Sequence, residues 1–319
     1  MGILSSGLFL YLAFRNVNLI LAFAVFKKVK YFYLILILFL TVLSYYFRAV
    51  RWYYLMRPLK SIRISSLFSA TMIGFMANNI LPARLGEVFR AYIIGRKENV
   101  KKAASFATII LERIFDATIL SFFLLFTLFF FTPPEWVKKG SYIFICIYFI
   151  SLTYIIALVF KTESTFSFSL FFIKLFPKKL KNRLTELLNS FTLGLGILKS
   201  INHLGIVFIL SFIIWLFCIL IIQVLFFSFS LHLPFYAAFV LLVFVSMGIT
   251  LPSSPGFIGT FQYFCIITLT LFPDVSKEAA LSYSILFHAS QYVPVTLIGL
   301  YCLWKEQLTF LELERQSQD

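Results

Sequence analysis

The sequence predicts an all-α protein that crosses a membrane several times. Of its 319 residues, 61% are hydrophobic and only 13% are charged. Apolar runs of about 20 residues, the length of helix that spans a hydrocarbon core about 30 Å thick, recur from end to end. We therefore expect one integral membrane domain over residues 1–319, with about six full spans and two re-entrant helical hairpins of opposite orientation.

The charge of the chain agrees with this class. A net charge of +15 would also suit a nucleic-acid-binding protein, but here the basic residues lie at the ends of the apolar runs. That placement favours the positive-inside rule and contact with anionic lipid headgroups, so no nucleic acid is expected. The four cysteines lie inside apolar runs without paired spacing and the three histidines are scattered, so we expect no disulfide, metal site or cofactor.

The N-terminal part begins with a short apolar run. Residues 3–14 predict a short first span, and residues 19–26 predict an interfacial piece that ends in lysines. A cleaved signal peptide is not expected, because no basic residue precedes the apolar run. The second span, residues 31–55, runs into a basic cluster that marks the cytoplasmic side. The cluster consists of Arg48, Arg51, Arg57, Lys60 and Arg63.

A broken element follows over residues 65–95. Pro82 cannot continue a hydrogen-bonded helix, and Gly86 permits a backbone excursion that other residues resist. The two arms, residues 65–80 and 82–95, are each too short for a comfortable crossing, which indicates a re-entrant hairpin that enters and leaves on the cytoplasmic side. Arg84, Glu87 and Arg90 are spaced by three and therefore lie along one side of the second arm.

The third span, residues 102–131, carries charge near mid-depth. Glu112 and Asp116 are four residues apart and share a face, and Arg113 can neutralise one of them or pair with the hairpin. A functional site and a buried salt bridge to the hairpin both fit this pattern. The fourth span, residues 142–160, leads to a polar segment, residues 161–200, which predicts an amphipathic helix on the cytoplasmic leaflet. A fifth span covers residues 204–230.

A second break repeats the first. Leu251-Pro252-Ser253-Ser254-Pro255-Gly256 has the same Leu-Pro-x-x-x-Gly pattern as Leu81-Pro82-Ala83-Arg84-Leu85-Gly86. Its arms, residues 235–251 and 256–272, are again short, and the last span, residues 279–304, follows. Because three full spans separate the hairpins, the second opens outward, and both chain termini are expected in the cytoplasm. Two broken hairpins of opposite orientation that meet near the midplane are typical of inverted-repeat transporters.

The polar residues at the two breaks and on the third span are the candidate site. Ser254 suits a helix N-cap and Pro255 the first helical position, so the free N–H groups there would favour an anion such as phosphate, although an ordinary kink explains them equally well. Interfacial pairing for structure also explains Arg84, Glu87 and Arg90, but a functional site is favoured because charge inside a membrane is costly and usually marks a pathway or site. His288 and Gln291 are expected as packing contacts. The candidate substrate-binding residues are Asn79, Arg84, Glu87, Arg90, Glu112, Arg113, Asp116, Ser253, Ser254, Gly256, Gly259 and Thr260, with no catalytic residue and no metal ligand among them.

Three motifs resemble a known family. They are Asn79-x-Leu81-Pro82-Ala83-Arg84-x-Gly86-Glu87-x-x-Arg90-Ala91, Glu112-Arg113-x-x-Asp116 and Pro252-x-x-Pro255-Gly256-x-x-Gly259-Thr260. In this order they resemble the flippase-like family that includes the membrane half of lysylphosphatidylglycerol synthases of the multiple-peptide-resistance-factor type. The resemblance implies a protein of the bacterial or archaeal cytoplasmic membrane that moves lipids or lipid-linked precursors between leaflets. Residues 1–319 carry neither the soluble aminoacyl-transferase domain nor a glycosyltransferase domain, so transferase activity is not the first expectation.

The leading functional hypothesis is translocation of an anionic phospholipid, or of a lipid-linked phosphate such as a polyprenyl phosphate, by alternating access at a polar site near the midplane. Membrane lipids are the expected partners, and a homo-oligomer is left open. Two alternatives remain at this point. One is a membrane-embedded lipid headgroup transferase similar to lysylphosphatidylglycerol synthase, and the other is a transporter of a small soluble anion.

Overall fold

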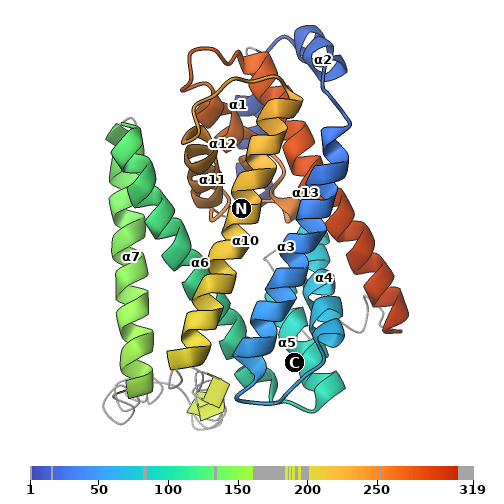
Figure 1. Ribbon diagram of the computed structural model, residues 1–319, viewed down its shortest axis with the longest axis vertical. Coiled ribbons are helices and arrows are strands. Elements are labelled where there is room, and N and C mark those ends of the chain that lie inside the picture. The colour runs from blue at the N-terminus through green and yellow to red at the C-terminus, as the bar shows by residue number, and fades with distance from the viewer. Residues whose placement is uncertain are drawn as a thin grey trace.

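A computed structural model describes residues 2–15, 17–81, 85–132, 135–160, 201–251 and 253–307, together with a few residues between 184 and 194, and these residues form helices joined by short connections (Figure 1). The helices are α1 (Gly2–Phe14), α2 (Leu19–Lys27), α3 (Tyr33–Met56), α4 (Ile64–Ile80), α5 (Gly86–Glu98), α6 (Lys102–Phe130), α7 (Glu135–Phe160), α10 (Ile201–Ser228), α11 (Ala237–Gly248), the 3₁₀ turn η3 (Pro255–Phe257), α12 (Thr260–Leu269) and α13 (Lys277–Lys305).

Several of these helices can cross a membrane. Within the described residues, α3, α13 and the His203–Ser228 part of α10 are long and apolar enough to do so. A fourth crossing is added if α1 and α2, which are bent by 79° relative to each other, form one broken span. The predicted all-α membrane class is therefore confirmed, while the count of about six spans stays a prediction.

The long helices join two apolar cores. In Figure 1, α3, α10 and α13 run through most of the length of the molecule, α11 and α12 lie in its upper half, and α5 lies in its lower half beside α4. The upper core includes Ile222, Leu241, Leu269 and Tyr283. The lower core includes Trp52, Leu67, Ile73 and Phe89. The first broken element therefore belongs to one core and the second broken element to the other.

The first break lies where the sequence predicts it. Helix α4 ends at Ile80, and α5 begins at Gly86 rather than at Pro82, which lies with Ala83 and Arg84 outside the described residues. The N–H of Gly86 donates to Oδ1 of Asn78 at 2.8 Å, so α4 itself satisfies one of the free N–H groups at the start of α5. A Cβ on Gly86 would meet the backbone oxygen of Gly74, which requires glycine at this crossing of α4 and α5.

The second break differs from its prediction. Ser254 was predicted as the N-cap of a half-helix, but Pro255–Phe257 forms only a 3₁₀ turn, and α12 begins at Thr260 with Gly259 as its N-cap. The reason is backbone geometry, because Gly256 (φ 66°) and Gly259 (φ 91°) both adopt left-handed conformations that interrupt a helix. The hydroxyl of Ser254 makes no capping bond, and its backbone N–H donates to Oγ of Ser6 in α1 at 2.7 Å.

The remaining boundaries are close to the predicted ones. Helix α7 begins at Glu135, seven residues before the predicted start of the fourth span, and α6, α10 and α13 match their predicted ranges closely. The amphipathic helix predicted within residues 161–200 lies almost entirely outside the described residues and stays a prediction.

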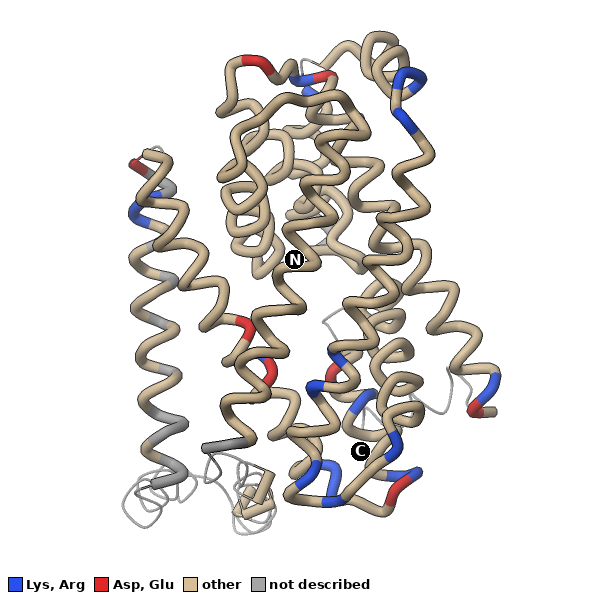
Figure 2. The backbone as a smooth tube through the Cα atoms, in the orientation of Figure 1, with Lys and Arg blue, Asp and Glu red and all other residues tan. Residues whose placement is uncertain are grey.

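Basic residues gather at one end of the molecule. Figure 2 shows Lys and Arg concentrated around the end where α5 lies. Ion pairs tie this end together, because Lys60 lies 3.4 Å from Glu98 and Lys97 lies 2.7 Å from Glu306. The assignment of this end to the cytoplasm rests on the positive-inside rule and stays a prediction.

Candidate functional site

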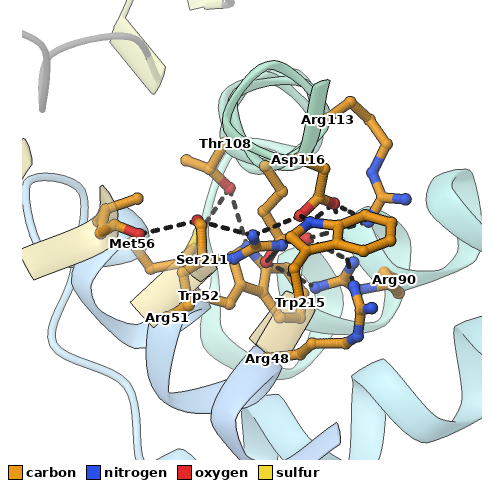
Figure 3. Close-up of polar contacts among 12 residues, drawn as sticks. Arg48, Arg51, Trp52, Met56, Arg90, Thr108, Arg113, Asp116, Ser211 and Trp215 are labelled. Atoms are coloured by element: carbon orange, nitrogen blue, oxygen red, sulfur yellow. Dashed lines mark hydrogen bonds and ion pairs between the residues drawn. The ribbon is translucent and has the colours of Figure 1, made fainter. Parts of the chain in front are cut away.

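Two carboxylates on α6 are the centre of a buried charged cluster. Glu112 is 1% exposed and Asp116 is 5% exposed, and their four-residue spacing places them on one face of the helix. Arginines from α3, α5 and α6 itself surround them (Figure 3). A helix through this core must satisfy these charges internally, because unpaired buried ions are costly.

Arg90 of α5 forms an ion pair with Glu112. Its Nη1 and Nη2 donate to the two carboxylate oxygens at 2.7 and 3.3 Å, a bidentate pair. The guanidinium also lies over the Trp52 ring, 4.1 Å from its centroid. Gly74 makes room for this side chain, because a Cβ there would meet Cγ and Cδ of Arg90. The salt bridge between the third predicted span and the hairpin, one of the two explanations weighed from the sequence, is therefore present.

Arg51 of α3 forms an ion pair with Asp116. Its Nη1 and Nη2 donate to the two oxygens of Asp116 at 2.7 and 3.4 Å, and Nη1 also donates to Oγ of Ser211 at 2.9 Å. The indole N–H of Trp215 donates to Oδ1 of Asp116 at 3.0 Å. Arg51 is completely buried. Helices α3, α6 and α10 therefore meet at one carboxylate.

The position of Arg51 corrects the sequence analysis. Arg48 and Arg51 were assigned to the cytoplasmic basic cluster with Arg57, but both point into the core among helices. Their three-residue spacing inside an aromatic, apolar stretch was the available signal, because a charge flanked by such residues on both sides belongs to a helix interior. Ser211 and Trp215 carried no sequence signal, since their role depends on the contact with Asp116.

Arg48 and Arg113 complete the cluster without a carboxylate of their own. Arg48 Nη1 lies 3.9 Å and Arg113 Nη2 lies 3.3 Å from Oδ2 of Asp116. Arg113 also lies 3.9 Å from Glu112. Among the residues that the structure describes, four arginines thus contact these two carboxylates, so this group of six side chains carries excess positive charge.

Of the other candidate residues of the first hairpin, the structure describes Glu87 and Asn79. Glu87 accepts a hydrogen bond from Nδ2 of Asn78 at 3.2 Å. The side chain of Asn79 turns to α13, where it donates to Oγ1 of Thr296 at 2.9 Å and to the carbonyl of Tyr292 at 3.4 Å. Arg84 lies outside the described residues. Arg90, Glu112, Arg113 and Asp116 are the predicted residues that the structure brings together.

The second break is held by a chain of neutral hydrogen bonds. His288 Nε2 lies 2.8 Å from the carbonyl of Gly256, which can only accept, so Nε2 carries the proton. Nδ1 then accepts from Nε2 of Gln262 at 2.8 Å, and Oε1 of Gln262 accepts from the N–H of Gly259 at 2.8 Å. Thr260 is fully buried. His288 is thus a satisfied structural contact, and so is Gln291, which donates to Oγ1 of Thr41 at 3.0 Å.

Two predicted residues of the second break, Ser254 and Gly256, contact neighbouring helices. Ser254 contacts α1 through Ser6, and a Cβ on Gly256 would lie 3.1 Å from the carbonyl oxygen of Asn79 in α4. The hydroxyl of Tyr292 donates to the same oxygen at 3.3 Å. The two breaks thus meet each other at the end of α4, and the contacts described for the second break run to α1, α4, α12 and α13.

Comparison with known proteins identifies one family whose sequence model matches most of the chain. The sequence model of the family described as "Lysylphosphatidylglycerol synthase TM region" matches residues 1–299, a range that includes both breaks and the whole charged cluster. Searches of curated proteins and of solved structures found no match.

Proposed function

Because this chain belongs to the lysylphosphatidylglycerol synthase transmembrane-region family, as its three motifs predicted, we propose that it moves an anionic phospholipid or a lipid-linked phosphate between the two leaflets of a cytoplasmic membrane. The observation that carries the proposal is the cluster of four arginines around the buried carboxylates of Glu112 and Asp116. Its positive charge exceeds its negative charge inside a protein whose surroundings are apolar.

The chemistry of the cluster suits a phosphate group. The arginine guanidinium presents several N–H groups in a planar fork that matches phosphate oxygens. Ionisable residues within membrane helices are expensive and usually mark a substrate or ion pathway. A phosphodiester headgroup supplies the negative charge that the described cluster lacks. The acyl chains of the lipid can stay in the apolar surroundings while the headgroup enters the cluster.

The arrangement of the two broken elements supports alternating access. Helices α4 and α5 lie in the half with the basic end, and α11 and α12 lie in the other half. In the proposal these are two re-entrant hairpins of opposite orientation, and the basic end, with both termini, faces the cytoplasm. One hairpin would rock against the other about the contact between Asn79 and Gly256.

The test is reconstitution in liposomes that contain a fluorescent phosphatidylglycerol reporter and an impermeant quencher on one side. We expect faster movement of the reporter between leaflets than in protein-free liposomes, a strong reduction for Arg113→Gln and Arg84→Ala, and native behaviour for Arg57→Gln, which removes an exposed arginine outside the cluster. A native protein that moves the reporter no faster than empty liposomes would overturn the proposal. Covalently altered lipid after incubation with a labelled donor would favour the headgroup-transferase alternative instead.

A further inference from the structure

Two of the four arginines in the cluster already have both of their Nη atoms on a carboxylate. Arg51 and Asp116, like Arg90 and Glu112, form pairs in which both guanidinium Nη atoms face both carboxylate oxygens. Such bidentate pairs are the strongest form of the arginine–carboxylate contact. All four of these side chains are almost completely buried. These two pairs therefore hold the helices together and have little capacity for a ligand.

The other two arginines share one oxygen. The Nη atoms of Arg48 and Arg113 both lie within 3.9 Å of Oδ2 of Asp116, the oxygen that also accepts the longer bond from Arg51. Arg48 is 12% exposed and Arg113 is 42% exposed, so they lie at the open edge of the cluster. Among the described residues, no hydrogen bond reaches the buried Nε of Arg48, and the same is true of Arg51 and Arg90, so Arg48 differs from them in that its Nη atoms also make no hydrogen bond to a carboxylate. The N–H donors of the arginines at this edge therefore outnumber the carboxylate oxygens that can accept from them.

Aromatic rings surround the guanidinium of Arg48 and stabilise its charge. Its guanidinium lies 5.5 to 5.9 Å from the centroids of the rings of Tyr45, Phe75 and Trp215. Aromatic faces stabilise a cation but offer no hydrogen-bond acceptor of the strength of a carboxylate or phosphate oxygen. The N–H groups of Arg48 therefore lack strong acceptors in an apolar setting, where a phosphate oxygen would be worth more than in water.

We propose that Arg48 and Arg113 form the phosphate-binding subsite of this chain, and that Oδ2 of Asp116 occupies the position of a phosphate oxygen until an anionic lipid headgroup displaces it. This inference deepens the proposed function and rests on it for the lipid as the source of the phosphate. Both arginines approach the same point, so one tetrahedral anion can bind both of them.

The displacement leaves no charge stranded. If Arg48 and Arg113 turn from Asp116 to a phosphate, Asp116 keeps its shortest contacts through Oδ1, which accepts from Arg51 at 2.7 Å and from Trp215 at 3.0 Å. The buried pair therefore stays neutral and hydrogen-bonded, and the cost of breaking a buried ion pair does not arise.

The charge of the site also restricts the headgroup. Even with Glu87 counted beside the cluster, the described residues hold four arginines and three carboxylates, which leaves one positive charge. A phosphodiester monoanion balances it. A headgroup that carries its own cation, such as phosphatidylcholine or an aminoacylated lipid, would bring that cation next to Arg48 and Arg113. The subsite should therefore prefer unmodified anionic phospholipids.

The test measures binding separately from transport. Purified full-length protein in a neutral detergent is titrated with short-chain phosphatidylglycerol, short-chain phosphatidylcholine and inorganic phosphate by isothermal titration calorimetry. We expect phosphatidylglycerol to bind at least about tenfold more tightly than phosphatidylcholine, and inorganic phosphate to bind only weakly. Arg48→Gln and Arg113→Gln should each weaken the binding of phosphatidylglycerol by about tenfold or more, Arg113→Lys should restore part of it, and Arg57→Gln should leave it unchanged.

The outcomes separate this inference from the proposed function. Unchanged phosphatidylglycerol affinity in well-folded Arg48→Gln and Arg113→Gln variants would overturn the subsite even if lipid movement in liposomes persists. Arginine-dependent binding without movement between leaflets would support the subsite and overturn translocation. Inorganic phosphate that binds as tightly as phosphatidylglycerol would overturn the lipid as the source and favour a soluble anion. Thermal unfolding of each variant confirms that the arginine substitutions leave the fold intact.

Discussion

The two breaks share a sequence pattern but not their surroundings. The first break, between α4 and α5, leads into the helix whose Arg90 pairs with Glu112 of α6. The second, Leu251–Gly256, is held by Gln262 and His288 in a chain of neutral hydrogen bonds. The same interruption of a helix therefore has two kinds of surroundings, a charged cluster near the first break and a neutral chain of hydrogen bonds that fixes the backbone at the second.

This difference leads us to expect lipid binding near the first break and a purely structural role for the second. In the proposed subsite, an anion replaces Asp116 at two arginines while Asp116 keeps the hydrogen bonds to its Oδ1. In the neutral chain each ring nitrogen of His288 has one hydrogen-bond partner, so binding a ligand there would break a hydrogen bond of the fold. We therefore expect substitutions at the first break to change both stability and lipid binding, and substitutions at the second to change stability alone.

The largest effect is expected at the pair of Arg90 and Glu112. Glu112→Ala leaves Arg90 buried without its partner, which should lower the free energy of unfolding by about 3–5 kcal/mol. Thermal unfolding in detergent, followed by intrinsic tryptophan fluorescence, measures the change. The double variant Arg90→Met with Glu112→Leu removes both charges and should recover most of the loss. Equal melting temperatures for Glu112→Ala and for Asp274→Ala, a change at an exposed acid, would contradict the prediction.

The glycines of the two breaks come next. Gly86→Ala places a methyl group against the backbone oxygen of Gly74, which cannot move aside, so a loss of about 1–3 kcal/mol is expected. Gly256→Ala meets mainly the ring of Tyr292 at 2.5 Å, a side chain that can shift, but it also forces a left-handed residue, so a similar or slightly smaller loss is expected.

Gly205→Ala is the matched control for both glycine variants. Nothing lies within 4 Å of a Cβ at Gly205, so alanine there should stabilise helix α10 by about 0.5–1 kcal/mol. The same unfolding assay compares the three variants. A Gly86→Ala protein as stable as Gly205→Ala would show that α4 and α5 are not in close contact.

Gln262→Leu tests the neutral chain directly. The substitution removes the acceptor of the Gly259 N–H and the donor to His288, and such unpaired buried groups cost about 1–3 kcal/mol in total. The melting temperature should fall while the affinity for phosphatidylglycerol stays within about twofold of the native value, a difference of less than 0.5 kcal/mol. A tenfold loss of affinity would mean that the second break takes part in binding.

The smallest effect is expected at the exposed ion pair of Lys97 and Glu306. The Nζ of Lys97 lies 2.7 Å from the carboxylate, but its side chain is 39% exposed, so solvent and salt screen the attraction. Lys97→Ala should cost at most about 1 kcal/mol, and the difference should vanish in high salt. A cost as large as that of Glu112→Ala would show that burial does not separate the two classes of ion pair.

The positions of the helices were largely predictable from the sequence, but the side-chain contacts between helices were not. The arms of the first hairpin and the long span with Glu112 follow from apolar length and from the helix-breaking Pro82 and Gly86. The pairing of Arg51 with Asp116 depends on how α3 packs on α6, which spacing along one chain does not encode. The start of α12 at Thr260 differs from the prediction because Gly256 and Gly259 both have left-handed backbone conformations, which the sequence pattern does not specify.

Chain order gives the buried cluster a consequence for biosynthesis. Arg48, Arg51 and Arg90 all emerge from the ribosome before Glu112 and Asp116, so the first helices enter the bilayer with cations whose acids have not yet been made. Because an unmatched arginine at membrane depth is costly, we expect α3 to remain beside the insertion machinery until α6 arrives. A nascent chain that stops short of residue 112 should accordingly stay bound to that machinery, and one that extends past α6 should be released into the lipid.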